Sequence, residues 1–167
     1  MSKLTALALS IAVLGGIWTF LALGPLGGMV LVWVGFIAWA CYFHTGGDNA
    51  ALQKTIAGMV YGGVIAGIAL ALVVANPIAL PAVAVAPVYV AVTVFFLVIV
   101  AGMPLLSVVP ANVYGYAAVA GYALSTNTAN LTTAPNFTNP VLLIALSTVF
   151  GAIFGMLSGK LAGVLGK

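Results

Sequence analysis

The chain has 167 residues, of which 65% are hydrophobic and only 3% are charged. Its mean hydropathy of +1.33 leaves too little polar surface to cover a soluble globule, and it has no basic stretch typical of a nucleic-acid-binding protein. We therefore expect an all-α integral membrane protein whose residues 1–167 form one transmembrane domain in a lipid bilayer.

Six apolar segments approach the length of a transmembrane helix. Such a helix needs about 20 residues to cross a hydrocarbon layer of about 30 Å. The predicted helices cover about 4–23, 26–44, 55–75, 80–103, 108–126 and 140–163. Glycine, proline and asparagine mark the breaks between them, most clearly in the polar, uncharged loop 125–139.

The four lysines predict the orientation of the chain. If all six segments cross the membrane, Lys3, Lys54, Lys160 and Lys167 all lie on one side. The positive-inside rule then places both the N terminus and the C terminus in the cytoplasm. A model with five crossings would divide the lysines between the two faces, so we favour six.

Two proline-containing segments have two interpretations each. Residues 76–87 and 102–112 interrupt apolar sequence with proline, which removes a backbone donor and disfavours helix in the preceding residue. Each segment is either a simple turn or a broken, re-entrant element whose free carbonyl groups face a cavity.

A weak internal repeat relates the third and fifth segments. Val60-Tyr61-Gly62 recurs as Val113-Tyr114-Gly115, and Asn76-Pro77 is echoed by Asn139-Pro140. Asparagine before proline is typical of a helix start. The pattern predicts a parallel repeat of two helical hairpins, with coincidence in a chain rich in alanine and glycine as the alternative.

Small residues recur every four positions on two predicted helices. Gly58, Gly62 and Ala66 form one such row, and Gly151, Gly155 and Gly159 form another. Rows of this kind allow helix backbones to approach closely. They indicate either packing within the chain or a seam between protomers, so a homo-oligomer is one expectation.

The sequence lacks the residues of an enzyme or a metal centre. One histidine, one cysteine and one aspartate cannot supply a closed ligand set, and no nucleophile stands beside a base. We therefore expect neither catalysis nor a cofactor. No charged residue lies deep in a predicted helix, so an ion-coupled carrier would lack its coupling group.

Buried polar and aromatic residues are the candidates for a solute path. A buried hydroxyl, indole or amide requires a hydrogen-bond partner, which is either a passing solute or a neighbouring helix. The proposed lining residues are Tyr61, Asn112, Tyr114 and Tyr116, with Trp39, Tyr42 and His44 at the inner mouth. His44 and Asp48 form either a titrating gate or a solvated interface in which Asp48 caps the next helix.

Three features resemble a known family. They are the segment Phe43-His44-Thr45-Gly46-Gly47, the segment Val109-Pro110-Ala111-Asn112-Val113-Tyr114-Gly115-Tyr116, and the glycine-rich last helix. The chain resembles small bacterial inner-membrane proteins of unknown function, and the resemblance implies that location without implying any activity.

The leading hypothesis is a channel or facilitator for a small neutral or weakly charged solute such as urea or a related amide, ammonia or water. Buried tyrosine, tryptophan and asparagine without coupling charges favour it. The rival hypothesis is a non-catalytic accessory or structural subunit of a larger membrane complex, because the chain has few polar loops and many glycines.

Overall fold

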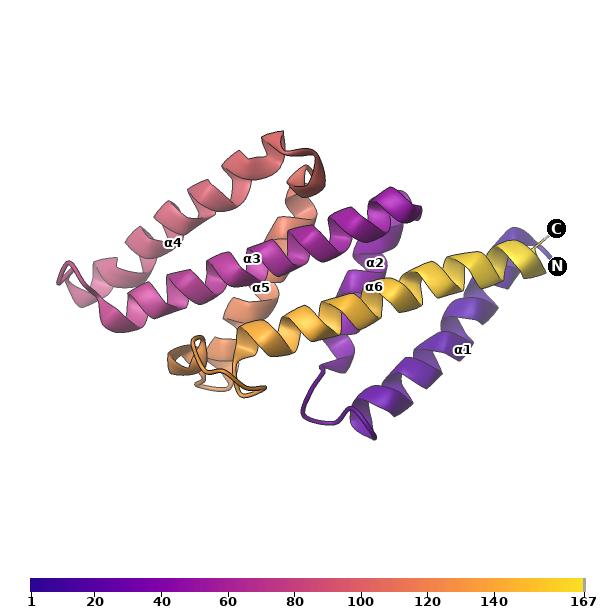
Figure 1. Cartoon of the computed structure of the whole chain (residues 1–167), viewed down its shortest axis with the longest axis horizontal. Coiled ribbons are helices and arrows are strands. Elements are labelled where there is room, and N and C mark those ends of the chain that lie inside the picture. Colours follow the sequence, from indigo (N-terminus) through magenta and orange to yellow (C-terminus); the bar gives the residue numbers. More distant parts are fainter. Residues whose placement is uncertain (167) are drawn as a thin grey trace. The chain divides into compact units, whose positions relative to one another are not determined.

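A computed structural model describes residues 1–166, and these residues form an all-helical chain without strands (Figure 1). Six α-helices follow one another, joined by turns and three short 3₁₀ helices. The α-helices are α1 (Lys3–Leu23), α2 (Val32–His44), α3 (Asn49–Ala75), α4 (Ala82–Ile99), α5 (Val109–Ser125) and α6 (Pro140–Leu165). The 3₁₀ helices are η1 (Val100–Gly102), η2 (Pro104–Leu106) and η3 (Ala129–Leu131). The predicted all-α class is confirmed.

Four segments of the described chain are long and apolar enough to cross a membrane. They are α1, α3, α4 with η1, and α6. Helix α2 has 13 residues and α5 has 17, so at 1.5 Å per residue they extend only about 20 and about 26 Å. The four long spans are typical of a membrane protein, whereas the prediction of six crossings stays a prediction.

The predicted start of the second helix is wrong by six residues. The prediction begins the helix at 26, but turns continue to Met29 and α2 begins only at Val32. Gly28 has φ +78°, a left-handed conformation that ends any helical run. Apolar composition alone therefore overestimated this helix, because Val30 is buried without being helical.

Helix α3 begins earlier than expected, at Asn49 instead of 55. Asp48 explains the earlier start, since its Oδ1 accepts the backbone N–H of Ala51 at 2.7 Å. This contact is a helix N-cap, which satisfies a backbone donor of the first turn. The capping interpretation of Asp48 is thus confirmed, and Lys54 lies inside the helix.

The helices form two compact units. The first unit contains residues Met1–Ile56 and Leu146–Lys167, and the second contains Ala57–Ala145. Helix α3 contributes its start to the first unit and the remainder to the second. Helix α6 contributes its start to the second unit and the remainder to the first.

In the first unit, α1 and α6 pack against α2 around tryptophan. Trp18 donates its indole N–H to the carbonyl of Val32 at 3.0 Å, and its ring lies over Gly35. Gly35 also meets Gly151 of α6, where an added Cβ on Gly151 would lie 2.1 Å from the Gly35 oxygen. Glycine at both positions therefore permits backbone contact between α2 and α6. The aromatic core around this contact comprises Trp18, Trp39 and Phe154.

In the second unit, α5 packs on α3 in the same manner. A Cβ on Gly115 would lie 1.9 Å from the carbonyl oxygen of Met59, and a Cβ on Gly62 would lie 1.8 Å from that of Asn112. Helix α4 adds to this pair through side-chain hydrogen bonds from α3 and α5.

The two units therefore share a pattern that differs from the predicted repeat. In each unit a shorter helix, α2 or α5, contacts a long helix, α6 or α3, through glycine. The local sequences agree: Val60-Tyr61-Gly62 of α3 matches Val149-Phe150-Gly151 of α6, and α2 and α5 carry Gly35 and Gly115. The similar segments lie three helices apart in the chain, α2 with α5 and α3 with α6. The predicted repeat, which relates α3 to α5, stays a prediction; the two helices differ in length and pack on each other.

Both proline-containing segments begin as turns. The Asn76 side chain receives the N–H of Leu80 and donates to its carbonyl, both at 3.0 Å, so residues 76–81 close into a tight turn. Pro87 lies within α4. After α4, η1 and η2 form two successive 3₁₀ turns that lead into α5. The turn interpretation therefore holds for residues 76–81 and for the connection between α4 and α5.

Loop 126–139 folds back onto its own unit. Asn139 donates to the carbonyls of Thr132 at 3.0 Å and Ala134 at 2.9 Å, and its Oδ1 accepts the N–H of Val141 at 2.8 Å. The predicted cap before Pro140 is confirmed. Asn76, by contrast, closes a turn and does not cap α4, whose N-cap is Pro81.

Candidate functional site

A row of polar side chains lies between α4 and α5 in the second unit. We name Tyr89, Thr93, Asn112 and Tyr116 the polar seam. Tyr89 and Thr93 are four residues apart, so both lie on the buried face of α4. The Thr93 hydroxyl lies 3.2 Å from that of Tyr116 and donates to the Tyr89 carbonyl at 2.8 Å. The seam contains no charged group.

Asn112 lies at one end of this seam and is fully buried. Its Nδ2 donates to the carbonyls of Leu97 and Leu106, each at 3.2 Å, which ties α5 to the end of α4 and to η2. From Tyr89 to Leu97 the α4 helix rises about 12 Å, so the seam covers a substantial part of one membrane crossing. Asn112 therefore has a structural role in the turn in addition to its place in the seam.

Two atoms of the polar seam lack hydrogen-bond partners. The Tyr89 hydroxyl and the Asn112 Oδ1 are both buried and unpaired. Burying a polar group without a partner costs roughly 1–3 kcal/mol, and native proteins contain few such groups. A small hydrogen-bonding molecule in the second unit would therefore gain the most binding free energy by pairing with these two atoms.

Tyr61 reaches α4 from another direction. Its hydroxyl donates to the carbonyl of Phe96 at 2.8 Å, so it forms a helix–helix hydrogen bond between α3 and α4. The side chains of Tyr61, from α3, and of Asn112 and Tyr116, from α5, thus all contact α4. Their observed partners are protein groups, which is also what the packing alternative expects.

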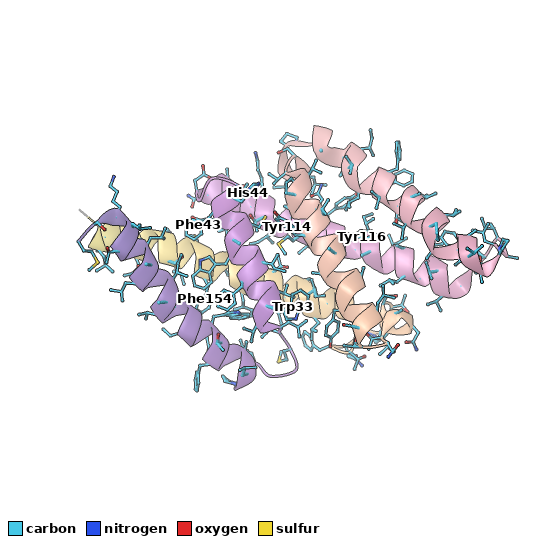
Figure 2. The ribbon with its side chains drawn as sticks, turned by 180° about the vertical axis from the view of Figure 1, so that it is seen from behind. Trp33, Phe43, His44, Tyr114, Tyr116 and Phe154 are labelled. Atoms are coloured by element: carbon cyan, nitrogen blue, oxygen red, sulfur yellow. The ribbon has the colours of Figure 1, made fainter. Side chains whose placement is uncertain are left out.

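Tyr114 does not join the seam. Tyr114 and Tyr116 are two residues apart on α5 and project from different sides of the helix (Figure 2). The Tyr114 side chain is 37% exposed, whereas the hydroxyl of Tyr116 contacts Thr93. Helical spacing alone predicts this separation, so Tyr114 is the weakest of the four lining candidates.

The inner-mouth candidates lie in the first unit. Trp39 is buried, donates its indole N–H to Ser158 Oγ at 3.0 Å, and stacks on Phe36. Tyr42 is also buried, and its hydroxyl donates to the carbonyl of Gly47. Both residues therefore pack α2 against its surroundings within the unit.

His44 is exposed at the end of α2. Within residues 1–166 it forms no ion pair with Asp48, whose carboxylate is engaged at the start of α3. The interpretation of His44 and Asp48 as a titrating gate stays a prediction. Cys41, three residues earlier, is a buried free thiol that accepts a hydrogen bond from Thr55 at 3.6 Å.

The glycine row of α6 is largely used inside the first unit. Gly151 meets Gly35, Gly155 meets Trp39 and Tyr42, and Gly159 lies against Phe43. Only Gly163 has open space where a Cβ would be added. The packing interpretation explains the first three glycines, so a protomer seam would need another surface.

Sequence reasoning missed two members of the polar seam, Tyr89 and Thr93. Their spacing of four residues in an otherwise apolar helix was the available signal, but it does not show which neighbour that face contacts. No group of three or more histidine, cysteine, aspartate or glutamate side chains converges within residues 1–166.

One comparison with known proteins gives a match. The family model described as "Protein of unknown function (DUF1097)" matches residues 8–163. The chain belongs to the DUF1097 family. The sequence-based resemblance to a family without an assigned activity is thereby confirmed. No curated protein and no solved structure matches the chain. For this member of the DUF1097 family, function must therefore be argued from the polar seam and from the physics of the bilayer.

Proposed function

We propose that this protein provides a path across the membrane for a small neutral or weakly charged solute of the urea and amide, ammonia or water class. The observation that carries the proposal is the polar seam with its two unpaired buried atoms, Tyr89 Oη and Asn112 Oδ1. In hydrocarbon, such atoms have no water to bind, so a hydrogen-bonding solute is a natural partner.

The absence of charge in the seam favours a neutral solute. Its members offer hydroxyl and amide groups, which can replace the hydration shell of a neutral molecule. An ion would need compensating charge or several carbonyl groups at the same depth. Tyr61 supports the same path, because its hydroxyl adds a further polar group on α4.

The proposed topology has six crossings with both termini in the cytoplasm of a bacterial-type cell. Helix α2 is short, but the non-helical Val30 and the extended Leu31 precede it. At about 3.3 Å per extended residue, Val30–His44 covers about 26 Å, close to the hydrocarbon thickness. The 17-residue α5 covers a similar distance. Val30 is buried, and the N–H of the half-buried Leu31 donates to Ser147 Oγ at 2.8 Å.

The similarity of helices three apart in the chain supports a role in membrane transport, without indicating which solute is transported. Three is an odd number, so α1–α3 and α4–α6 enter the membrane from opposite sides if every helix crosses it. Inverted repeats of this kind recur in membrane transporters, where they allow one part to move against the other. The glycine contacts of α2 with α6 and of α5 with α3 each join a helix of one repeat to a helix of the other.

Flux into proteoliposomes tests the proposal. The full chain is reconstituted in vesicles. Light scattering follows vesicle shrinkage and re-swelling to measure water and urea permeability, and a pH-sensitive dye inside the vesicles measures ammonia permeability. We expect at least one permeability above that of protein-free vesicles, and it should fall in Tyr89→Phe and Tyr116→Phe but not in Tyr114→Phe. Permeabilities equal to those of empty vesicles for all three solutes would rule out the path.

The accessory-subunit alternative draws on the apolar surface of α4. Only 17% of the α4 span is buried within the chain, and a shallow cavity of about 420 Å³ on it is lined by Ala91, Val94, Phe95, Val98 and Ile99. Lipid, a second copy or another protein would cover this face. Gentle purification from native membranes distinguishes the two functions. Co-purification of another protein in a fixed ratio supports the accessory role, and a homo-oligomer supports the channel.

A further inference from the structure

An open cavity in the first unit has the chemistry of an anion site. It is an open depression of about 780 Å³, lined among others by Lys3, Tyr42, Gly46, Asp48, Lys160 and Gly163, and we name it the lysine depression. Its volume lies within the range of small-molecule sites. We propose that the lysine depression binds the phosphate group of an anionic lipid.

The ends of four helices and one turn build the depression. The start of α1, the end of α2, the glycine-rich turn 45–48, the start of α3 and the last turns of α6 meet there. The start of α1 and the end of α6 lie side by side (Figure 1), and a Cβ on Gly166 would lie 3.4 Å from the Lys3 Cα. The turn is shaped by Gly46 and Gly47, which have φ +125° and +70°.

The charges of the depression favour an anion. It is lined by two of the chain's four lysines and by its single acid. Asp48 is already engaged by the Ala51 N–H, and within residues 1–166 neither lysine ammonium has a carboxylate within ion-pair distance. The net local charge from Lys3, Lys160 and Asp48 is +1, and both ammonium groups remain available to a phosphate.

Backbone donors add to these charges. The first N–H groups of a helix have no intrahelical partner and attract anions together with the helix dipole. Asn49 is the first residue of α3 and lines the depression. An anion held by Lys3 and Lys160 would therefore also lie near this helix start.

The position and the remaining lining favour a lipid over a soluble anion. Lys3 is the first residue of α1 and Lys160 lies near the end of α6, both of which are long enough to span a membrane. A site at the ends of such helices lies at the depth of lipid headgroups, and basic pockets there bind anionic headgroups. Leu7, Phe43 and Ala162 supply apolar surface for the upper part of an acyl chain.

Lipid binding by matched variants tests the inference. The full chain is purified in a neutral detergent and titrated with phosphatidylglycerol or phosphatidylcholine, and bound lipid is counted by native mass spectrometry. We expect tighter binding of phosphatidylglycerol, and about 30-fold weaker binding in Lys3→Gln/Lys160→Gln, since each lysine near an anionic surface contributes about tenfold or less. Lys3→Arg/Lys160→Arg should retain binding. Lys54→Gln removes one lysine charge outside the depression and should bind as the unmodified chain does.

The controls separate the sources of the phosphate group. Equal weakening by Lys54→Gln, or equal binding of both lipids, would overturn the inference, because either result indicates nonspecific attraction. Titration with glycerol 3-phosphate tests whether a soluble phosphate binds equally well. If it binds as tightly as phosphatidylglycerol, the lipid assignment is also overturned. Thermal unfolding in neutral detergent verifies that the double variants are folded.

Discussion

Gly151 of α6 lies directly against Gly35 of α2, with no room for a side chain between the two backbones. A Cβ atom on Gly151 would lie 2.1 Å from the Gly35 carbonyl oxygen and 2.5 Å from its Cα. On the other side of Gly35, the Trp18 ring would lie 2.5 Å from an added Cβ. Gly35 is therefore held between α1 and α6, and the first unit depends on glycine at this crossing.

Gly151→Ala should destabilise the first unit. The methyl group would meet backbone atoms, which cannot move aside as a flexible side chain can, so we expect a loss of about 1–3 kcal/mol in unfolding free energy. Gly163→Ala is the matched control on the same helix, because no atom lies within 4 Å of its added Cβ. Unfolding in mixed detergent micelles measures both. Equal stability of the two variants would contradict the observed crossing.

The same test applies to the second unit at Gly115. Its added Cβ would lie 1.9 Å from the Met59 carbonyl oxygen, whereas Gly121 on the same helix has open space. Gly115→Ala should therefore lower the unfolding temperature clearly, while Gly121→Ala should leave it unchanged or raise it slightly, since alanine favours helix. A neutral Gly115→Ala would show that α5 does not pack on α3 in this way.

Asn112→Leu should loosen the connection between α4 and α5. The substitution keeps the side-chain size but leaves the carbonyls of Leu97 and Leu106 without the donor they now share. Hydrogen bonds between membrane helices contribute about 0.6–2 kcal/mol each, so we expect a loss of about 1–3 kcal/mol. Hydrogen exchange should also speed up in residues 100–108. Asn130→Leu, in the exposed loop, is the control and should change neither quantity.

Two tyrosine variants should shift stability in opposite directions. The Tyr89 hydroxyl is buried and unpaired, so Tyr89→Phe should raise the unfolding temperature in the absence of solute. The Tyr61 hydroxyl donates to Phe96, so Tyr61→Phe should lower it. Thermal unfolding of both variants in solute-free detergent provides the comparison. A destabilised Tyr89→Phe would show that this hydroxyl already has a partner and would weaken the argument for a solute there.

Helix positions could largely be predicted from the sequence, because hydropathy and helix-ending residues act locally. Pro140 starts α6 where Asn139 caps it, and the polar loop after Ser125 ends α5 close to the expected position. The prediction failed where apolar residues are not helical, as at Val30. Burial in hydrocarbon and burial against a neighbouring helix require the same composition, so hydropathy could not distinguish them.

The candidate site could be predicted only in part. Asn112, Tyr61 and Tyr116 stood out as polar groups in apolar sequence, and the structure brings them to α4. Tyr89 and Thr93 did not stand out, because which face of α4 turns inward depends on contacts far away in the sequence. For the same reason the glycine rows could not be assigned to packing until their partners were known.

The amino-acid sequence by itself determined that this chain is helical and apolar, and where most of its helices begin and end, since these properties depend on neighbouring residues and on the cost of burying charge. The tertiary structure alone decided that α2 and α5 are the short helices held by glycine contacts, and that polar groups on α4 and α5 meet in one seam. Such contacts depend on the angle and depth at which helices cross, and single-residue changes in helix start or rotation change which side chains meet.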